Sequence, residues 1–171
     1  MVQSVKGQTE FQFVVAGVTT VDRKIYDDIL RGTDIKLVTN QTYEILDCAY
    51  AALVASGTAT LETALFKVPQ AVLYRMEGGW ITELIMRNFV LKVTWASLPN
   101  LILNKAAIQE FLQIDMTVKN VKTELDKLLF NLEYRNTMIE DYNQLAEIMG
   151  TPGTSEKAAR QMVDLLLNFK P

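Results

Sequence analysis

A Ser-Gly-Thr turn in the middle of the chain carries the residue types best suited to chemistry. Ser56, Gly57 and Thr58 follow a short apolar run and precede a helical pattern. Such a turn brings free backbone N–H groups and the positive end of a helix dipole to one point, where phosphate oxygens bind well. An ordinary helix cap has the same pattern, so the turn is compatible with a phosphate site and with a purely structural helix start.

Glu62 is the acidic residue that accompanies this turn. The helix expected after Thr58 has one core-facing stripe, formed by Leu61, Ala64, Leu65 and Val68. Glu62 lies about 100° around the helix from Leu61, off the stripe. Its carboxylate is therefore placed to reach a ribose or sugar hydroxyl.

Two further polar residues follow predicted strands or turns. Pro99 fixes the backbone and pushes Leu98 into extended geometry, so Asn100 is presented in a rigid turn. Asn100 either forms a local Asx turn or offers its amide to a nucleotide or sugar hydroxyl. Arg75, directly after a predicted strand, either forms a surface ion pair or holds a diphosphate through two parallel hydrogen bonds.

The composition excludes several classes of function. The chain has 171 residues, of which 49% are hydrophobic, and a net charge of −3, so nucleic acid is not an expected partner. No histidine is present, which excludes histidine acid–base catalysis and histidine metal sites. The single cysteine, Cys48, is expected to be a small buried hydrophobe. With no apolar run near the roughly 18 residues of a membrane span and no signal peptide, we expect the cytosol or its membrane face.

An alternation of strands and helices must position these polar residues. The expected strands are 11–16, 35–38, 52–54 and 70–74, and the first helix, 19–31, is expected to turn Val21, Ile25, Ile29 and Leu30 inward. Short apolar strands separated by helices are typical of parallel sheets with both faces covered. The sequence therefore predicts a Rossmann-like, doubly wound α/β fold. Its ligands should bind at the carboxyl ends of the strands, where 56–58 and 74–76 fall.

After Asn104 the pattern is helical only. Apolar residues repeat at three- and four-residue steps over 118–132 and 138–149, and a last helix follows the break at 150–153, with a stripe of Ala159, Met162, Val163 and Leu166. We expect these stripes to be packing surfaces. The chain is thus predicted to be a single domain, 1–171, with an α/β part of about 11–104 and a helical part of about 105–171.

The ordered set of motifs resembles the lipid-A-disaccharide synthase family of GT-B glycosyltransferases. The segments that carry the resemblance are Ala-Ser-Gly-Thr-Ala-Thr-Leu-Glu at 55–62, Pro69, Tyr-Arg-Met at 74–76, Ser-Leu-Pro-Asn-Leu-Ile at 97–102, Glu-Phe-Leu-Gln at 110–113 and Gly-Thr-Ser-Glu-Lys-Ala-Ala at 153–159. The resemblance covers about residues 11–168 and is to the C-terminal half of the family.

The resemblance implies a reaction and a donor site. The family transfers 2,3-diacylglucosamine from UDP-2,3-diacylglucosamine to 2,3-diacylglucosamine 1-phosphate in lipid A biosynthesis, with inversion and without a metal or other cofactor. Its C-terminal domain binds the UDP donor, which implies donor contacts for Ser56, Gly57, Thr58, Glu62, Arg75, Asn100, Glu110 and Gln113. It also implies a full-length peripheral protein on the cytoplasmic face of the inner membrane of a Gram-negative bacterium.

The chain departs from the family in two respects. Family members are longer, and neither their N-terminal domain, which supplies the general base, nor their glycine-serine-arginine turn has a counterpart here. Where the family has Gly-Arg-Glu after the Pro-Asn turn, this chain has Asn-Lys-Ala at 104–106. We therefore expect a fragment that begins after the first strand of its domain, contains no catalytic residue and is inactive alone. A missing strand leaves an unpaired sheet edge, so we expect a homodimer by strand or helix exchange.

Two other classes of function stay open. One is the donor domain of another UDP-sugar GT-B enzyme, such as the peptidoglycan N-acetylglucosaminyltransferase or a UDP-N-acetylglucosamine epimerase. Those families have a glycine-richer turn at the position of 56–58. The other is a noncatalytic nucleotide-binding module. An exposed apolar surface over residues 80–89 would favour the lipid-related function over this module.

Overall fold

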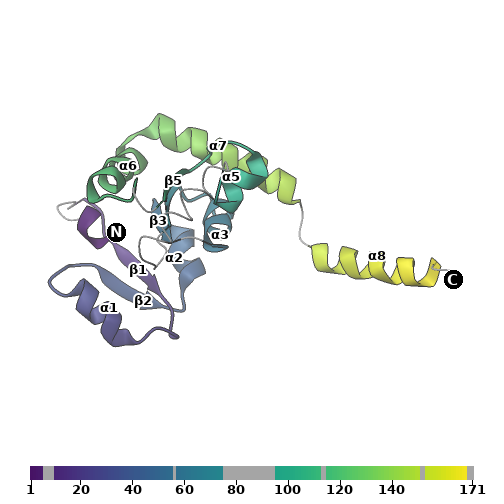
Figure 1. The fold of residues 1–171 in the computed structure, drawn as a ribbon, viewed down its shortest axis with the longest axis horizontal. Helices are drawn as coiled ribbons and strands as arrows, with labels where there is room; N and C mark the ends of the chain where they lie inside the picture. Colours follow the sequence, from purple (N-terminus) through teal and green to yellow (C-terminus); the bar gives the residue numbers. More distant parts are fainter. Residues whose placement is uncertain (6–9, 56, 75–94, 113–114, 151–152, 169–171) are drawn as a thin grey trace, which may run out of the picture.

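The computed structural model describes residues 1–5, 10–55, 57–74, 95–112, 115–150 and 153–168 (Figure 1). The apolar segment 80–89, and with it the test of the lipid-related function, lies outside these residues. Within the described ranges, no helix is long and apolar enough to cross a membrane.

Five short strands in the described ranges pair in parallel and form two sheets. β1 (Val14–Gly17) pairs with β2 (Lys36–Thr39), while β3 (Ala52–Ala55), β4 (Gln70–Tyr74) and β5 (Gln109–Leu112) form a second sheet in that order. Parallel strands joined through helices confirm the predicted Rossmann-like α/β fold class. β5 was not predicted, because its four residues, Gln-Glu-Phe-Leu, are too few to show a period and begin with two polar side chains.

The helices are short in the first part of the chain and long in the second. They are η1 (Val2–Ser4), α1 (Arg23–Leu30), α2 (Thr42–Cys48), α3 (Ala59–Leu65), α5 (Leu98–Leu103), α6 (Val118–Phe130), α7 (Leu132–Met149) and α8 (Thr154–Asn168). Thr117 caps α6, since its hydroxyl accepts a hydrogen bond from the Asn120 N–H. Asn131 ends α6 and caps α7 by accepting from the Tyr134 N–H.

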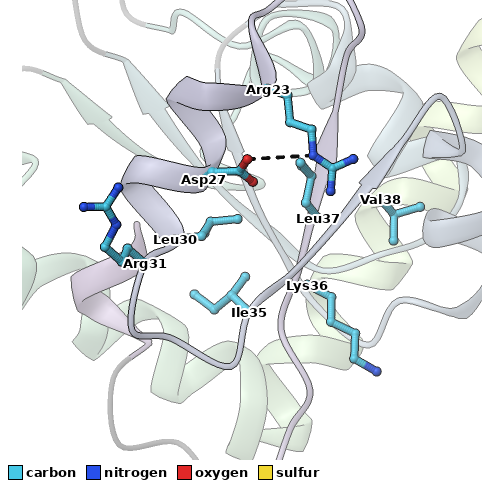
Figure 2. Close-up of a pocket in the computed structure, with 8 residues that line it drawn as sticks. All are labelled: Arg23, Asp27, Leu30, Arg31, Ile35, Lys36, Leu37 and Val38. Atoms are coloured by element: carbon cyan, nitrogen blue, oxygen red, sulfur yellow. Dashed lines mark ion pairs between the residues drawn. The ribbon is translucent and has the colours of Figure 1, made fainter.

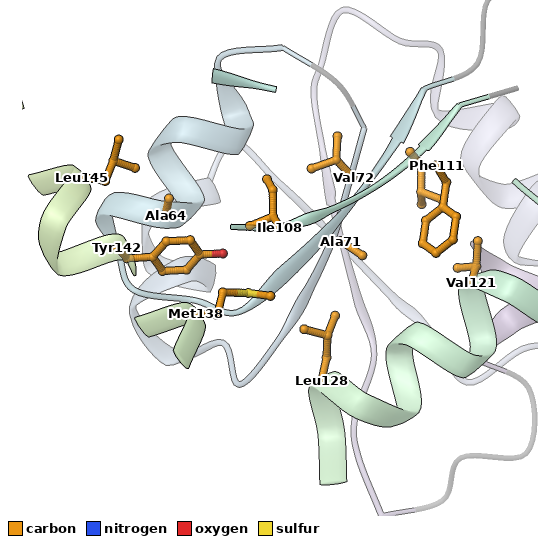
Figure 3. Close-up of a cluster of buried hydrophobic side chains, with 11 residues drawn as sticks. Ala64, Ala71, Val72, Ile108, Phe111, Val121, Leu128, Met138, Tyr142 and Leu145 are labelled. Carbon is orange, nitrogen blue, oxygen red and sulfur yellow. The ribbon is translucent and has the colours of Figure 1, made fainter. Parts of the chain in front are cut away.

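The main core lies where α3, α6 and α7 meet the three-stranded sheet (Figure 3). The central strand β4 contributes Ala71 and Val72, which are completely buried. Leu128 from α6 and Tyr142 from α7 are equally buried against them. A strand buried on both faces reads as a continuous apolar run, which is why β4 was predictable. This core fixes the position of α3 and of the turn before it.

Several predicted burial patterns are wrong. Ile25 and Ile29 of α1 are 52% and 57% exposed, whereas Val21 and Leu30 are half-buried, so the helix turns only part of the predicted stripe inward. Cys48 is exposed at the end of α2, where its Sγ donates to carbonyls of its own helix. Cys48 begins an apolar run over residues 48–55, which the structure divides between the end of α2 and β3.

The predicted stripe of α8 is also wrong as a packing surface. Figure 1 shows α8 extending away from the rest of the molecule, at the yellow end of the chain. Leu166 is 77% exposed, and Met162 and Val163 are also exposed. The amphipathic pattern predicted the helix correctly, but it did not indicate what the apolar face contacts.

Candidate functional site

The turn before α3 is fixed by hydrogen bonds on its buried side, and its other side faces solvent. Gly57 has φ +115°, a conformation that side-chain-bearing residues rarely adopt, and no atom lies within 4 Å of where a Cβ would stand. The Thr60 hydroxyl donates to the Gly57 carbonyl at 2.9 Å, and the Gln70 amide donates to the Thr60 carbonyl at 2.9 Å. Gly57 and Thr58 are exposed, and the Thr58 side chain makes no capping hydrogen bond to α3. Ser56 lies outside the described residues.

Glu62 lies in the first turn of α3 and is half-buried. The Tyr43 hydroxyl donates to its Oε1 at 3.4 Å, and the Tyr43 ring stacks on Phe66 with 5.6 Å between ring centroids. In the predicted α3 stripe, Ala64 and Val68 are buried, whereas Leu65 is exposed and that prediction is wrong. Sequence reasoning missed Tyr43, because its contact with Glu62 spans 19 residues.

Asn100 is completely buried and fully engaged with the backbone around β5. Its Nδ2 donates to the Ile108 carbonyl and to Glu110 Oε1, each at 2.9 Å. Its Oδ1 accepts from the Ile108 N–H, also at 2.9 Å. Both alternatives predicted for Asn100, an Asx turn and an exposed amide, are therefore wrong. The side chain joins the start of α5 to β5.

Glu110 faces the N-terminal end of α5 from β5. Its Oε1 accepts from the Ser97 N–H at 2.8 Å and from the Ser97 hydroxyl at 2.6 Å, and its Oε2 accepts from the Ala96 N–H at 3.0 Å. Ser97, which sequence reasoning did not single out as a site residue, is thus a partner of the predicted residue Glu110. The carboxylate satisfies backbone donors that a helix start leaves without intrahelical acceptors.

Tyr74 ends β4 beside this network. Burial, and next the negative charge of Glu110, raise the pKa of the Tyr74 phenol to about 12. In the sheet Tyr74 lies opposite Leu112 of β5. Arg75 and Gln113, which follow these two residues in the chain, lie outside the described residues.

The predicted residues that the structure describes form two groups around the three-stranded sheet. Gly57, Thr58 and Glu62 follow β3 at its carboxyl end, whereas Asn100 and Glu110 belong to α5 and β5. β4 separates β3 from β5, and α3 contacts α5. Among the described residues no hydrogen bond joins the two groups, so each is organised by its own contacts.

The surface hollow between α1 and β2 contains none of these residues. Figure 2 shows it lined by Arg23, Asp27, Leu30, Arg31, Ile35, Lys36, Leu37 and Val38. Its two arginines are exposed, and they pair with acidic residues of α1, with Arg23 Nε 3.8 Å from Asp27 and Arg31 2.6 Å from Asp28. Such exposed pairs on a helix are ordinary surface contacts.

Comparisons with known proteins agree on one family. The family model described as Lipid-A-disaccharide synthetase matches residues 3–163. The chain is 29% identical over 158 residues to the lipid-A-disaccharide synthase of Anaeromyxobacter dehalogenans (strain 2CP-C), covering 91% of this chain and 40% of the relative. It is 33% identical to that of Colwellia psychrerythraea, covering 78% and 32%, and 34% identical to that of Synechocystis sp., covering 72% and 31%. The chain thus spans about 40% of the length of the first of these relatives.

Proposed function

Because the chain belongs to the lipid-A-disaccharide synthase family, we propose that it is the UDP-donor-binding part of a glycosyltransferase. The reaction proposed is transfer of 2,3-diacylglucosamine from UDP to 2,3-diacylglucosamine 1-phosphate. The observation that carries the proposal is the family match over residues 3–163 of an α/β chain. In this proposal the acceptor site and the general base are supplied by sequence outside this chain, and the chain alone is inactive in transfer.

The donor contacts proposed here begin at the turn before α3. Backbone N–H groups of Ser56, Gly57 and Thr58 bind the diphosphate, and the Glu62 carboxylate accepts from the ribose hydroxyls. The left-handed backbone at Gly57 supports this role, because a glycine allows a ligand to approach the chain closely. Arg75 and Gln113 complete the site in this proposal.

Asn100 and Glu110 are proposed to line the same site. Their contacts with Ser97 and Ile108 support an indirect part, in which they hold the backbone of residues 96–100 in place for the donor. Lys105, which stands in the segment where the family has an arginine, forms an ion pair with Asp141 of α7. That pairing supports a structural role for the lysine in this chain.

Replacing Glu62 with alanine is expected to weaken UDP binding about tenfold, or about 1.4 kcal/mol. The carboxylate can accept from two neighbouring hydroxyls at once, and alanine cannot. Isothermal titration calorimetry of the wild-type chain and Glu62→Ala measures the difference. Glu147→Ala, an exposed glutamate of α7, is the matched control and should bind UDP as the wild type does.

Absence of UDP binding by a chain with an intact circular dichroism spectrum would contradict a donor-binding part. Binding that is equal for wild type and Glu62→Ala would contradict the ribose contact alone.

We also propose that the chain forms a homodimer by exchange of a strand or of α8. The exposed apolar residues of α8 support helix exchange. Among the described strands every strand except β4 has a single neighbour, which supports strand exchange. Sedimentation equilibrium is expected to give twice the chain mass. If α8 is exchanged, Leu166→Asp should give a monomer, whereas Gln161→Asp, on the polar side of α8, should not. A monomeric wild-type chain at high concentration would contradict dimerisation.

The acylated substrates support a location for the full-length enzyme. Transfer between two diacylated sugars requires access to a lipid surface, so we propose a peripheral protein on the cytoplasmic face of the inner membrane. In this proposal the contact with lipid is made by the whole enzyme.

A further inference from the structure

Tyr43 contacts both the carboxylate of Glu62 and the ring of Phe66. The Tyr43 hydroxyl lies 3.4 Å from Glu62 Oε1, and the Tyr43 and Phe66 rings stack with an interplanar angle of 9°. Tyr43 is 56% exposed and Phe66 is 39% exposed. A stacked aromatic pair that stays this exposed contributes little to the core, so the cluster calls for another explanation.

The order of strands and helices brings these three side chains together. α2 begins directly after β2, and α3 begins shortly after β3, so both helices start at the carboxyl edge of their parallel strands. Tyr43 is in the first turn of α2 and Glu62 is in the first turn of α3. Phe66 follows Glu62 by four residues and therefore lies on the same side of α3. One tyrosine ring can thus contact Phe66 with its face and Glu62 with its hydroxyl.

We propose that Tyr43 is a positioning residue that orients Glu62 for the hydroxyls of the ribose in a nucleoside diphosphate. This inference rests on the proposed function, in which Glu62 accepts from those hydroxyls. A carboxylate offers about four lone-pair positions, so a bond from Tyr43 to Oε1 leaves enough acceptors for two ligand hydroxyls.

The physical gain is preorganisation. A glutamate on a helix surface loses rotamer freedom when it binds a ligand, and this loss weakens affinity. Stacking on Phe66 restrains the Tyr43 ring, and its hydroxyl then restrains the carboxylate before the ligand arrives. The substitution Tyr43→Phe keeps the ring and the stack and removes only the hydroxyl.

The test compares two ligands, UDP and 2′-deoxy-UDP, by calorimetric titration. The proteins are the wild type, Tyr43→Phe, Glu62→Ala and the double variant. Tyr43→Phe is expected to weaken UDP about threefold, the size of one modest hydrogen bond. Its effect on 2′-deoxy-UDP should be smaller, so the preference for UDP falls. In the Glu62→Ala background, Tyr43→Phe should have no further effect. Tyr26→Phe removes the hydroxyl of a tyrosine of α1 that accepts from the Val18 N–H, away from Glu62. It is the control and should leave the preference unchanged.

The outcomes separate this inference from the proposed function. If Glu62→Ala weakens UDP but Tyr43→Phe does not, or if Tyr43→Phe weakens both ligands equally, the positioning role is wrong and the donor site stands. Additive effects in the double variant would also overturn it, because Tyr43 would then act independently of Glu62. A folded chain that binds neither ligand would contradict the donor-binding function and this inference together.

Discussion

Replacing Asn100 with alanine is expected to lower the free energy of unfolding by about 3 kcal/mol. The substitution leaves the N–H and C=O of Ile108 without their side-chain partner in a completely buried environment. It also removes a donor from the Glu110 carboxylate. Buried polar groups that lose their hydrogen bonds cost more than the bonds themselves contribute. Urea denaturation of the wild type and the variant measures the difference.

Asn120→Ala is the matched control, because Asn120 is an exposed residue whose amide donates to the Asp115 carbonyl on the surface. Its expected cost is below about 1 kcal/mol. Asn100→Asp adds a second check, since its carboxylate would face Glu110. The pKa of the new carboxyl should be raised, so the variant should lose stability as the pH rises from 4 to 7. Equal stability of the two alanine variants would contradict the role of Asn100 in joining α5 to β5.

Arg135→Met is expected to destabilise the chain by about 3 kcal/mol. The guanidinium is buried and donates to the Tyr50 carbonyl at 2.9 Å and to the Leu128 carbonyl at 2.6 Å. It also lies 3.5 Å from the centroid of the Tyr50 ring. Leu128 is in the last turn of α6, where helix carbonyls lack intrahelical partners. Arg135 therefore connects α7 to the end of α6 and to the segment that leads into β3.

Thermal and urea denaturation should both show this loss, with no change in the dependence on urea concentration if unfolding stays two-state. Arg160→Met in α8 is the control, because its ion pair with Glu156 is exposed on both sides. Its expected cost is within about 0.5 kcal/mol. A loss of the same size in both variants would show that the buried contacts of Arg135 contribute no more than a surface pair.

The fold class was predictable because the responsible signals are local. The continuous apolar run of β4 and the three- and four-residue repeats of α6 and α7 each reflect which side chains one element must bury. β5 was missed because four residues carry too little of any period. The family resemblance was also predictable, since it rests on the order of short motifs, and the family match over residues 3–163 confirms it.

The sequence by itself determined the order of the elements, the glycine turn before α3 and the family of the chain. Only the tertiary structure decided that Tyr43 meets Glu62, that Asn100 is buried against Ile108, and that α1 and α8 keep apolar side chains exposed. The physical reason is the range over which each property acts. Backbone preferences and hydrophobic periods are set within a few neighbouring residues. Side-chain partners depend on sheet register and helix packing, which bring together residues distant in the chain.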